Sequence, residues 1–131
     1  MIVLDTHAWI WWVAEPERLS RKARDIIEDA AGKREVYVSS ISTWEVAMLV
    51  DRSRLKLKMH VRDWIALSES LPALRFVPVD NAIALKAIFL PAYRNRDPAD
   101  RIIIATAITL GKTLITKDRK IRSYGPVPTS W

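Results

Sequence analysis

Four carboxylic acids occupy awkward positions in this chain, at the edge of, or inside, otherwise apolar runs. They are Asp5, Glu45, Asp100 and Asp118. Charged side chains are rarely buried without a partner, so acids that adjoin core segments need an explanation. If folding gathers them, the natural partner is a hard divalent cation, because carboxylate oxygens are its preferred ligands.

Gathering these acids without a counter-charge would be costly. Two carboxylates about 5 Å apart repel by roughly 3 kcal/mol at an effective dielectric of about 20. A few such pairs would rival the net stability of a whole domain, about 5–15 kcal/mol. Bound Mg²⁺ or Mn²⁺ would remove the repulsion, and a two-ion site would also stabilise the attacking and leaving oxygens in phosphodiester cleavage. That chemistry requires no nucleophilic serine or cysteine.

The acids must be positioned by the elements around them, and these alternate between short β-branched runs and longer helical runs. This pattern predicts an α/β fold with a parallel sheet covered on both faces. The expected strands are Ile2–Leu4, Val36–Ser39, Leu74–Val79, Thr113–Thr116 and Val127–Thr129. The expected helices are Ala8–Ala14, Leu19–Ala31, Thr43–Val50, His60–Ser70, Asn81–Leu90 and a last one from Pro98 to Gly111.

The acids fall at one edge of this sheet. Asp5 and Asp118 come directly after strands, while Glu45 and Asp100 lie in the first turns of helices. Ligands of open α/β sheets bind outside the carboxyl ends of the strands. All four side chains are therefore expected at a common rim.

Each acid also has a simpler explanation. Asp5 could cap the first helix, and Glu45 could be the capping-box partner of Ser42. Asp100 could serve only to favour the helix dipole, and Asp118 could be an ordinary turn residue. Only the joint placement favours a shared metal site over these alternatives.

Composition sets broad limits. The chain has 131 residues, half of them hydrophobic and none of them cysteine, which excludes disulfides and cysteine-based zinc sites. We expect a single domain spanning residues 1–131, soluble and cytoplasmic, with no membrane segment. The net charge of +6 favours polyanionic partners such as nucleic acid.

Basic residues gather in sequence around the third and fourth acids. Arg96, Arg101, Lys117 and Arg119 are candidates to bind RNA phosphates. Arg101 has an alternative role in a structural ion pair with a neighbouring acid.

Three of the six tryptophans lie on the first expected helix, at Trp9, Trp11 and Trp12. Core packing should account for most tryptophans. A helix that is apolar on more than one face, however, indicates burial against another chain. We therefore expect at least one of these three in an interface with a second subunit or a partner helix.

Taken in order, the acid-bearing segments resemble the PIN-domain family, and within it the VapC-type toxin ribonucleases of type II toxin–antitoxin systems. The resemblance is carried by Ile2–His7, Ser40–Ala47, Arg96–Ala107 and Leu114–Asp118. It implies a three-layer α/β/α domain with a five-stranded parallel sheet. It also implies endonucleolytic cleavage of RNA with Mg²⁺ or Mn²⁺, a homodimer, and a cognate VapB-like antitoxin.

The resemblance also implies residue roles. Asp5, Asp100 and Asp118 would hold the metal, and Glu45 would complete the catalytic acids. Thr116 would orient the metal-binding acids without binding the metal itself, and Asp97 would cap the helix that presents Asp100. Two positions depart from the family pattern: Asn95 stands where relatives often have histidine, and Ala99 where they often have phenylalanine.

Other classes fit the chain less well. A receiver-like phosphoacceptor domain usually has adjacent acids after an early strand and an aspartate after a middle strand, and neither is present. A haloacid-dehalogenase-type phosphatase expects a second aspartate two positions after Asp5, where His7 stands. The remaining alternative is a catalytically silent PIN-fold module that binds RNA or protein.

Overall fold

The computed structural model describes all 131 residues. Its centre is one parallel sheet of five strands in the order β3-β2-β1-β4-β5. The strands are β1 (Ile2–Leu4), β2 (Val36–Ser39), β3 (Leu74–Val77), β4 (Thr113–Ile115) and β5 (Thr129–Ser130). The central strand β1 is buried along its whole length, as expected for a parallel sheet covered on both faces.

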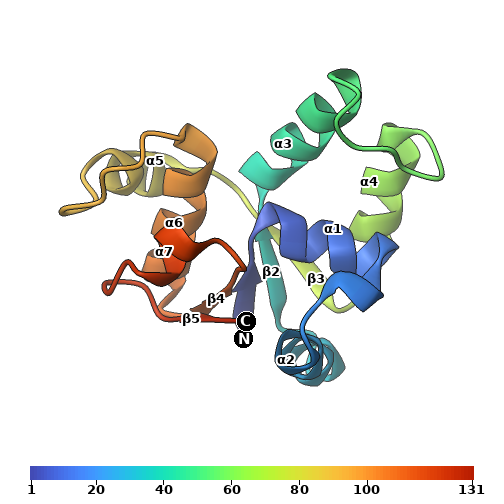
Figure 1. Ribbon diagram of the computed structural model, residues 1–131, viewed down its shortest axis with the longest axis horizontal. Helices are drawn as coiled ribbons and strands as arrows, with labels where there is room; N and C mark the ends of the chain where they lie inside the picture. Colours follow the sequence, from blue (N-terminus) through green and yellow to red (C-terminus); the bar gives the residue numbers. More distant parts are fainter.

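Seven α-helices and one 3₁₀ turn surround the sheet. They are α1 (Thr6–Ala14), η1 (Pro16–Arg18), α2 (Arg21–Gly32), α3 (Ser40–Asp51), α4 (Val61–Ser70), α5 (Asn81–Ile88), α6 (Pro98–Leu110) and α7 (Arg119–Arg122). Figure 1 shows α5, α6 and α7 on one side of the sheet and α1, α2 and α4 on the other. The α/β fold with five parallel strands and helices on both faces is confirmed. No helix combines the length and the apolar character needed to cross a membrane.

Each face of the sheet has its own hydrophobic core. The larger one packs α1, α2 and α4 against β1 and β2, with Trp9 and Trp64 in contact at its centre. The other packs α6 and α7 against β1 and β4 and includes Ile103 and Ile121. The two cores share β1: Ile2 and Leu4 face the larger core and Val3 faces the other. The end of β1 at Leu4 is therefore packed on both sides.

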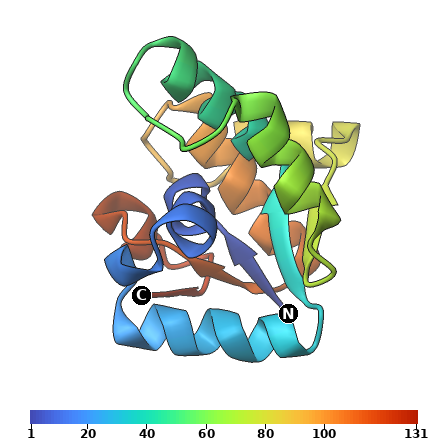
Figure 2. The ribbon, with the colours of Figure 1, turned by 90° about the vertical axis from the view of Figure 1, so that its right-hand side faces the viewer.

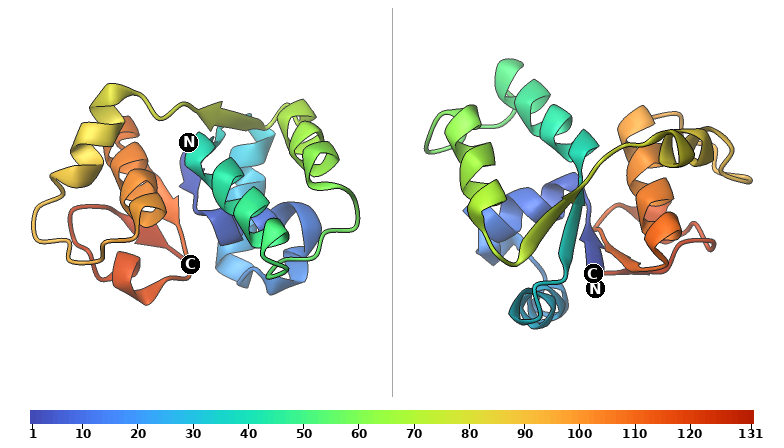
Figure 3. Two further views of the ribbon diagram at one scale, coloured as in Figure 1. Left: turned by 90° about the horizontal axis from the view of Figure 1, so that it is seen from above. Right: turned by 180° about the vertical axis from the view of Figure 1, so that it is seen from behind.

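Helix α3 rises from the carboxyl-end edge of the sheet, while α2 lies across the opposite end (Figure 2). Seen from above and from behind, the chain passes from β3 to α5 across the sheet from one helical layer to the other (Figure 3). The carboxyl-end edge is therefore framed by α1, α3 and α6 and not closed over by a further layer.

Several boundaries differ from those predicted. α1 begins two residues earlier than expected, because Asp5 caps it and accepts a hydrogen bond from the backbone N–H of Ala8. α3 begins at Ser40 and is capped by Ser39, so the capping box between Ser42 and Glu45 does not form. The short helix α7 was not predicted, since four residues carry too little periodicity to be recognised.

Candidate active site

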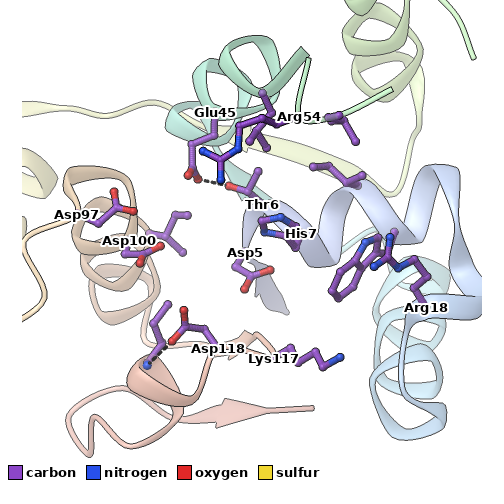
Figure 4. A pocket seen from close by; sticks show the side chains of 16 residues that line it. Asp5, Thr6, His7, Arg18, Glu45, Arg54, Asp97, Asp100, Lys117 and Asp118 are labelled. Carbon is purple, nitrogen blue, oxygen red and sulfur yellow. Dashed lines mark hydrogen bonds between the residues drawn. The ribbon is translucent and has the colours of Figure 1, made fainter. Parts of the chain in front are cut away.

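A pocket of about 760 Å³ takes in all four of the predicted acids, together with Asp97. It opens at the carboxyl-end edge of the sheet. Figure 4 shows Asp5, Glu45, Asp97, Asp100 and Asp118 arranged around one space, although they come from four separate segments. The predicted convergence of the acids on a common rim is thus observed.

Asp5 is oriented by the start of α1. Its Oδ1 accepts from the N–H of Ala8 at 2.8 Å, and its own N–H donates to the carbonyl of Ile115 across the sheet at 3.1 Å. Burial raises the pKa of Asp5, hydrogen bonds from Thr116 and Ala8 lower it, and the charge of Asp118 raises it further. Capping and membership of the acid pocket are therefore compatible roles for this residue.

Glu45 is held by a chain of buried hydroxyls. The Thr6 hydroxyl is hydrogen-bonded both to Glu45 Oε1 and to Ser42 Oγ, the latter at 2.8 Å. A hydroxyl has one proton, so Thr6 donates to the carboxylate and accepts from Ser42. Burial raises the pKa of Glu45, the bond from Thr6 lowers it, and the charge of Asp97 raises it again.

Asp100 carries the clearest sign of crowded negative charge. The Asn95 amide donates to its Oδ2 at 3.1 Å, and Asp97 caps α6 by accepting from Ala99, as predicted. The pKa of Asp100 is raised from 3.8 to about 7, first by burial and then by the charges of the other four acids, Asp97, Glu45, Asp118 and Asp5. A carboxyl in this position is protonated far more readily than an ordinary aspartate, and nearby positive charge would favour its ionised form.

Asp118 caps α7 and is fixed from both sides. Its Oδ1 accepts from the N–H groups of Lys120 and Ile121 at 2.8 and 3.1 Å. The hydroxyl of Thr116, which is completely buried, accepts from the N–H of Asp118 at 3.1 Å. Thr116 therefore contacts both Asp5 and Asp118, a placement that suits its predicted orienting role.

The donor set fits a hard divalent cation. Each of the four acids has one oxygen anchored by protein donors, and none forms an ion pair: the salt bridges join Met1 to Glu35, Glu15 to Arg18 and Asp29 to Lys33. The pocket offers carboxylate oxygens, one imidazole and no thiol. As the side chains stand, no three acidic or histidine side chains are spaced to hold one ion. The assignment of metal to Asp5, Asp100 and Asp118 therefore stays a prediction.

The basic candidates Lys117, Arg119 and Arg96 lie at three different places relative to the acids. Lys117 lines the main pocket, and Arg119 lines a smaller hollow beside it, shared with Asp97, Asp100 and Asp118. Arg96 is exposed outside both.

Arg101 requires a correction. Its guanidinium donates to four backbone carbonyls, at 2.7–3.0 Å, two at the end of α5 and two in the segment between α5 and α6. These are the carbonyls of Ala87, Ile88, Tyr93 and Asn95. With its donors engaged in this way, Arg101 has a structural role, and its contact with RNA stays a prediction. The alternative, an ion pair with a neighbouring acid, is wrong, because Arg101 forms no salt bridge.

The tryptophans of α1 differ in their surroundings. Trp9 is fully buried, and its indole donates to Ser68 Oγ at 3.3 Å, so it belongs to the core and not to an interface. Trp11 and Trp12 are both partly buried against the larger core, and Trp11 also lines the acid pocket.

Sequence reasoning missed residues that orient the acids. Thr6 and Asn95 each donate to a pocket carboxylate, and Arg18 and Arg54 line the same pocket. Thr6 follows Asp5 directly, so its position beside an acid at a helix start was an available signal. Arg54 lies in the connector between α3 and α4, where nothing local indicates which way the side chain turns.

Comparisons with known proteins agree on one family. The family model described as PIN domain matches residues 2–125. Ribonuclease VapC22 of Mycobacterium tuberculosis is 42% identical over 123 residues, which cover 94% of this chain and 91% of that protein.

Solved structures share the fold. The crystal structure of FitAcB from Neisseria gonorrhoeae is 25% identical with a TM-score of 0.68, covering 98% of this chain and 96% of that one. VapBC2 from Rickettsia felis, bound to a DNA fragment from its promoter, is 18% identical with a TM-score of 0.72, covering 99% of this chain and 98% of that one.

Proposed function

The chain belongs to the PIN domain family, and on that premise we propose that it is a metal-dependent endoribonuclease acting as the toxin of a toxin–antitoxin pair. The observation that carries the proposal is the pocket in which four acids meet and none of them forms a salt bridge. The ribonuclease named among its relatives is 42% identical over nearly the whole chain. Decay to a silent binding module is disfavoured, because all four acids are present.

In this proposal Asp5, Asp100 and Asp118 hold Mg²⁺ or Mn²⁺, and Glu45 completes the site. A bound divalent cation would supply an activated water and stabilise charge on the phosphodiester oxygens. The chain's own residues fix the acids beforehand: Thr6 orients Glu45, Asn95 orients Asp100, and Thr116 lies between Asp5 and Asp118. Asp100, whose pKa is about 7, must release its proton before it can bind metal.

The partners follow from the same premise. Relatives solved as toxin–antitoxin assemblies include a complex from Klebsiella pneumoniae, 22% identical. We propose a VapB-like antitoxin as the cognate partner of this chain, a homodimer as its assembly, and the cytoplasm, where cellular RNA lies, as its place of action.

The test uses end-labelled structured RNA, purified protein, and Mn²⁺ or Mg²⁺. We expect cleavage that stops with chelator and falls at least about 100-fold in Asp5→Asn, since even residues one step removed from a metal are worth 10–100-fold. Asp80→Asn is the matched control, because Asp80 caps α5 with the same geometry but lies outside the pocket.

Asparagine is as good a helix cap as aspartate, so both variants should fold alike. Activity that survives chelation, or an equal loss in both variants, would contradict the metal mechanism. Binding without cleavage by the wild-type protein would favour the silent module.

A further inference from the structure

The acid pocket has a second half whose chemistry is different. Beside the acids it is lined by Trp11, His7, Arg18 and Lys117. Figure 4 shows Lys117 and Asp118, neighbours in the chain, directing their side chains to different parts of the pocket. Asp118 joins the acids, and Lys117 extends toward the side where Arg18 lies.

Trp11 is the centre of this second half. The centroid of its ring lies 5.6 Å from that of the His7 ring and 5.7 Å from that of the Trp131 ring. The Arg18 guanidinium carbon is 5.0 Å from the Trp11 centroid, and the Lys117 ammonium is 5.9 Å from it. Two cations therefore cover one partly exposed indole at the mouth of a pocket full of acids.

Core packing explains only part of this arrangement, because Trp11 is partly buried against the larger core and also lines the pocket. The tryptophan that the larger core buries fully is Trp9, two positions earlier on the same helix. Trp11 instead faces the pocket, and Lys117 above it forms no salt bridge, while Arg18 pairs only with exposed Glu15 at 3.2 Å. Aromatic rings interleaved with cations beside a phosphodiester-cleaving site have the composition of a single-stranded nucleic-acid binding surface.

We propose that Trp11 is the stacking platform for the nucleobase next to the scissile phosphodiester, with Arg18 and Lys117 moving from its ring to the flanking phosphates. This assignment rests on the proposed ribonuclease function, and it specifies which part of the RNA the pocket binds. A base stacked on an indole is worth more than an exposed cation–π contact, so the nucleobase displaces the cations. The displaced cations then lie next to the phosphates that the base brings with it.

The test measures binding of a fluorescein-labelled single-stranded oligoribonucleotide by anisotropy, in an Asp100→Asn background that keeps the RNA intact. A second probe has the same phosphates but abasic sugars. Trp11→Leu should weaken binding of the intact probe about tenfold, within the range found for removing a stacking aromatic. It should leave binding of the abasic probe unchanged. Trp11→Phe, which keeps an aromatic face, should retain most of the affinity.

Trp44→Ala is the matched control, because it removes an indole that is 58% exposed and lies outside the pocket. Its affinity for both probes should equal that of the Asp100→Asn parent. In the otherwise wild-type enzyme, Trp11→Leu should raise KM about tenfold with kcat nearly unchanged, the signature of lost substrate binding.

Equal loss on both probes, no loss on either, or the same loss in Trp44→Ala would overturn the stacking assignment while leaving the ribonuclease intact. A protein that neither binds nor cleaves RNA would overturn the proposed function itself. If Trp11→Leu does not fold, the stacking assignment is still tested by comparing the two probes on the protein that keeps Trp11. The Asp100→Asn protein must then bind the intact probe more tightly than the abasic one by about tenfold.

Discussion

The two halves of the pocket are built in different ways. In the acid half, every carboxylate has one oxygen fixed by a backbone N–H, a hydroxyl or an amide. In the aromatic half, the two cations over Trp11 are on flexible side chains, and the Arg18 side chain is more than half exposed. The difference indicates that the groups for chemistry are preorganised, whereas the groups for recognition can rearrange around a substrate.

Among the tests of this contrast, the largest effect is expected from loosening the acid half without removing an acid. Thr6→Val keeps the shape of the side chain but leaves Glu45 and Ser42 without their shared partner. We expect RNA cleavage to fall about 10–100-fold, the usual result of losing a residue that orients a metal-site ligand. Cleavage of labelled RNA at saturating Mn²⁺ measures this.

Thr106→Val serves as the control for Thr6→Val. Its hydroxyl is also buried but donates within α6, to the carbonyl of Ile102 at 2.7 Å, and it does not line the pocket. If both variants retain full activity, the rigid acid half is not required and the contrast between the two halves fails.

Arg101 tests whether the support of the acid half extends beyond the pocket. Arg101→Ala removes four hydrogen bonds to backbone carbonyls, two at the end of α5 and two in the segment that carries Asn95. We expect the free energy of unfolding to fall by about 2 kcal/mol, because charged donors to partly buried carbonyls are lost. A thermal melt should show a Tm lowered by roughly 6–10 °C for a chain of this size.

Lysine at position 101 should not restore stability, since an ammonium cannot reproduce the fork of the guanidinium. Arg119→Ala is the matched control: this exposed arginine lines the hollow beside the acids, and its loss should lower RNA affinity without lowering Tm. A stable Arg101→Ala protein with weakened RNA binding would support the role that the sequence first assigned to Arg101.

Features that depend on residues close together in the sequence were predicted, and contacts between residues far apart in the sequence were not. Four of the five strands, the cap at Asp97 and the rim position of the acids depend on local pattern and on the geometry of parallel sheets, and these were predicted. The expected strand Val127–Thr129 shares only Thr129 with β5, which spans Thr129–Ser130. The partners of Glu45 and Arg101 lie elsewhere in the chain: Thr6 is 39 positions from Glu45, and Ala87 is 14 from Arg101. Spacing within a helix cannot reveal such contacts, which explains why a capping box was expected at Ser42.

The smallest effect concerns charge alone and tests whether the acid half is electrostatically strained. The pKa of Asp100 is about 7 in the folded protein against an ordinary value of 3.8, so folding favours its protonated form. Its contribution to stability is complete below pH 3.8 and is lost as pH rises through 7. The metal-free protein should therefore melt at a lower temperature at pH 8 than at pH 5.

Asp100→Asn removes the charge but keeps the hydrogen bond from Asn95, because an amide oxygen can still accept it. Without metal, this variant should be at least as stable as the wild type at pH 8, and its Tm should depend less on pH. Mn²⁺ should stabilise the wild type at pH 8 and not the variant, because the cation supplies the positive charge that offsets the repulsion among the ionised acids. A clear loss of metal-free stability in Asp100→Asn would mean that Asp100 serves the helix dipole of α6, and that the repulsion among the acids is too weak to require a cation.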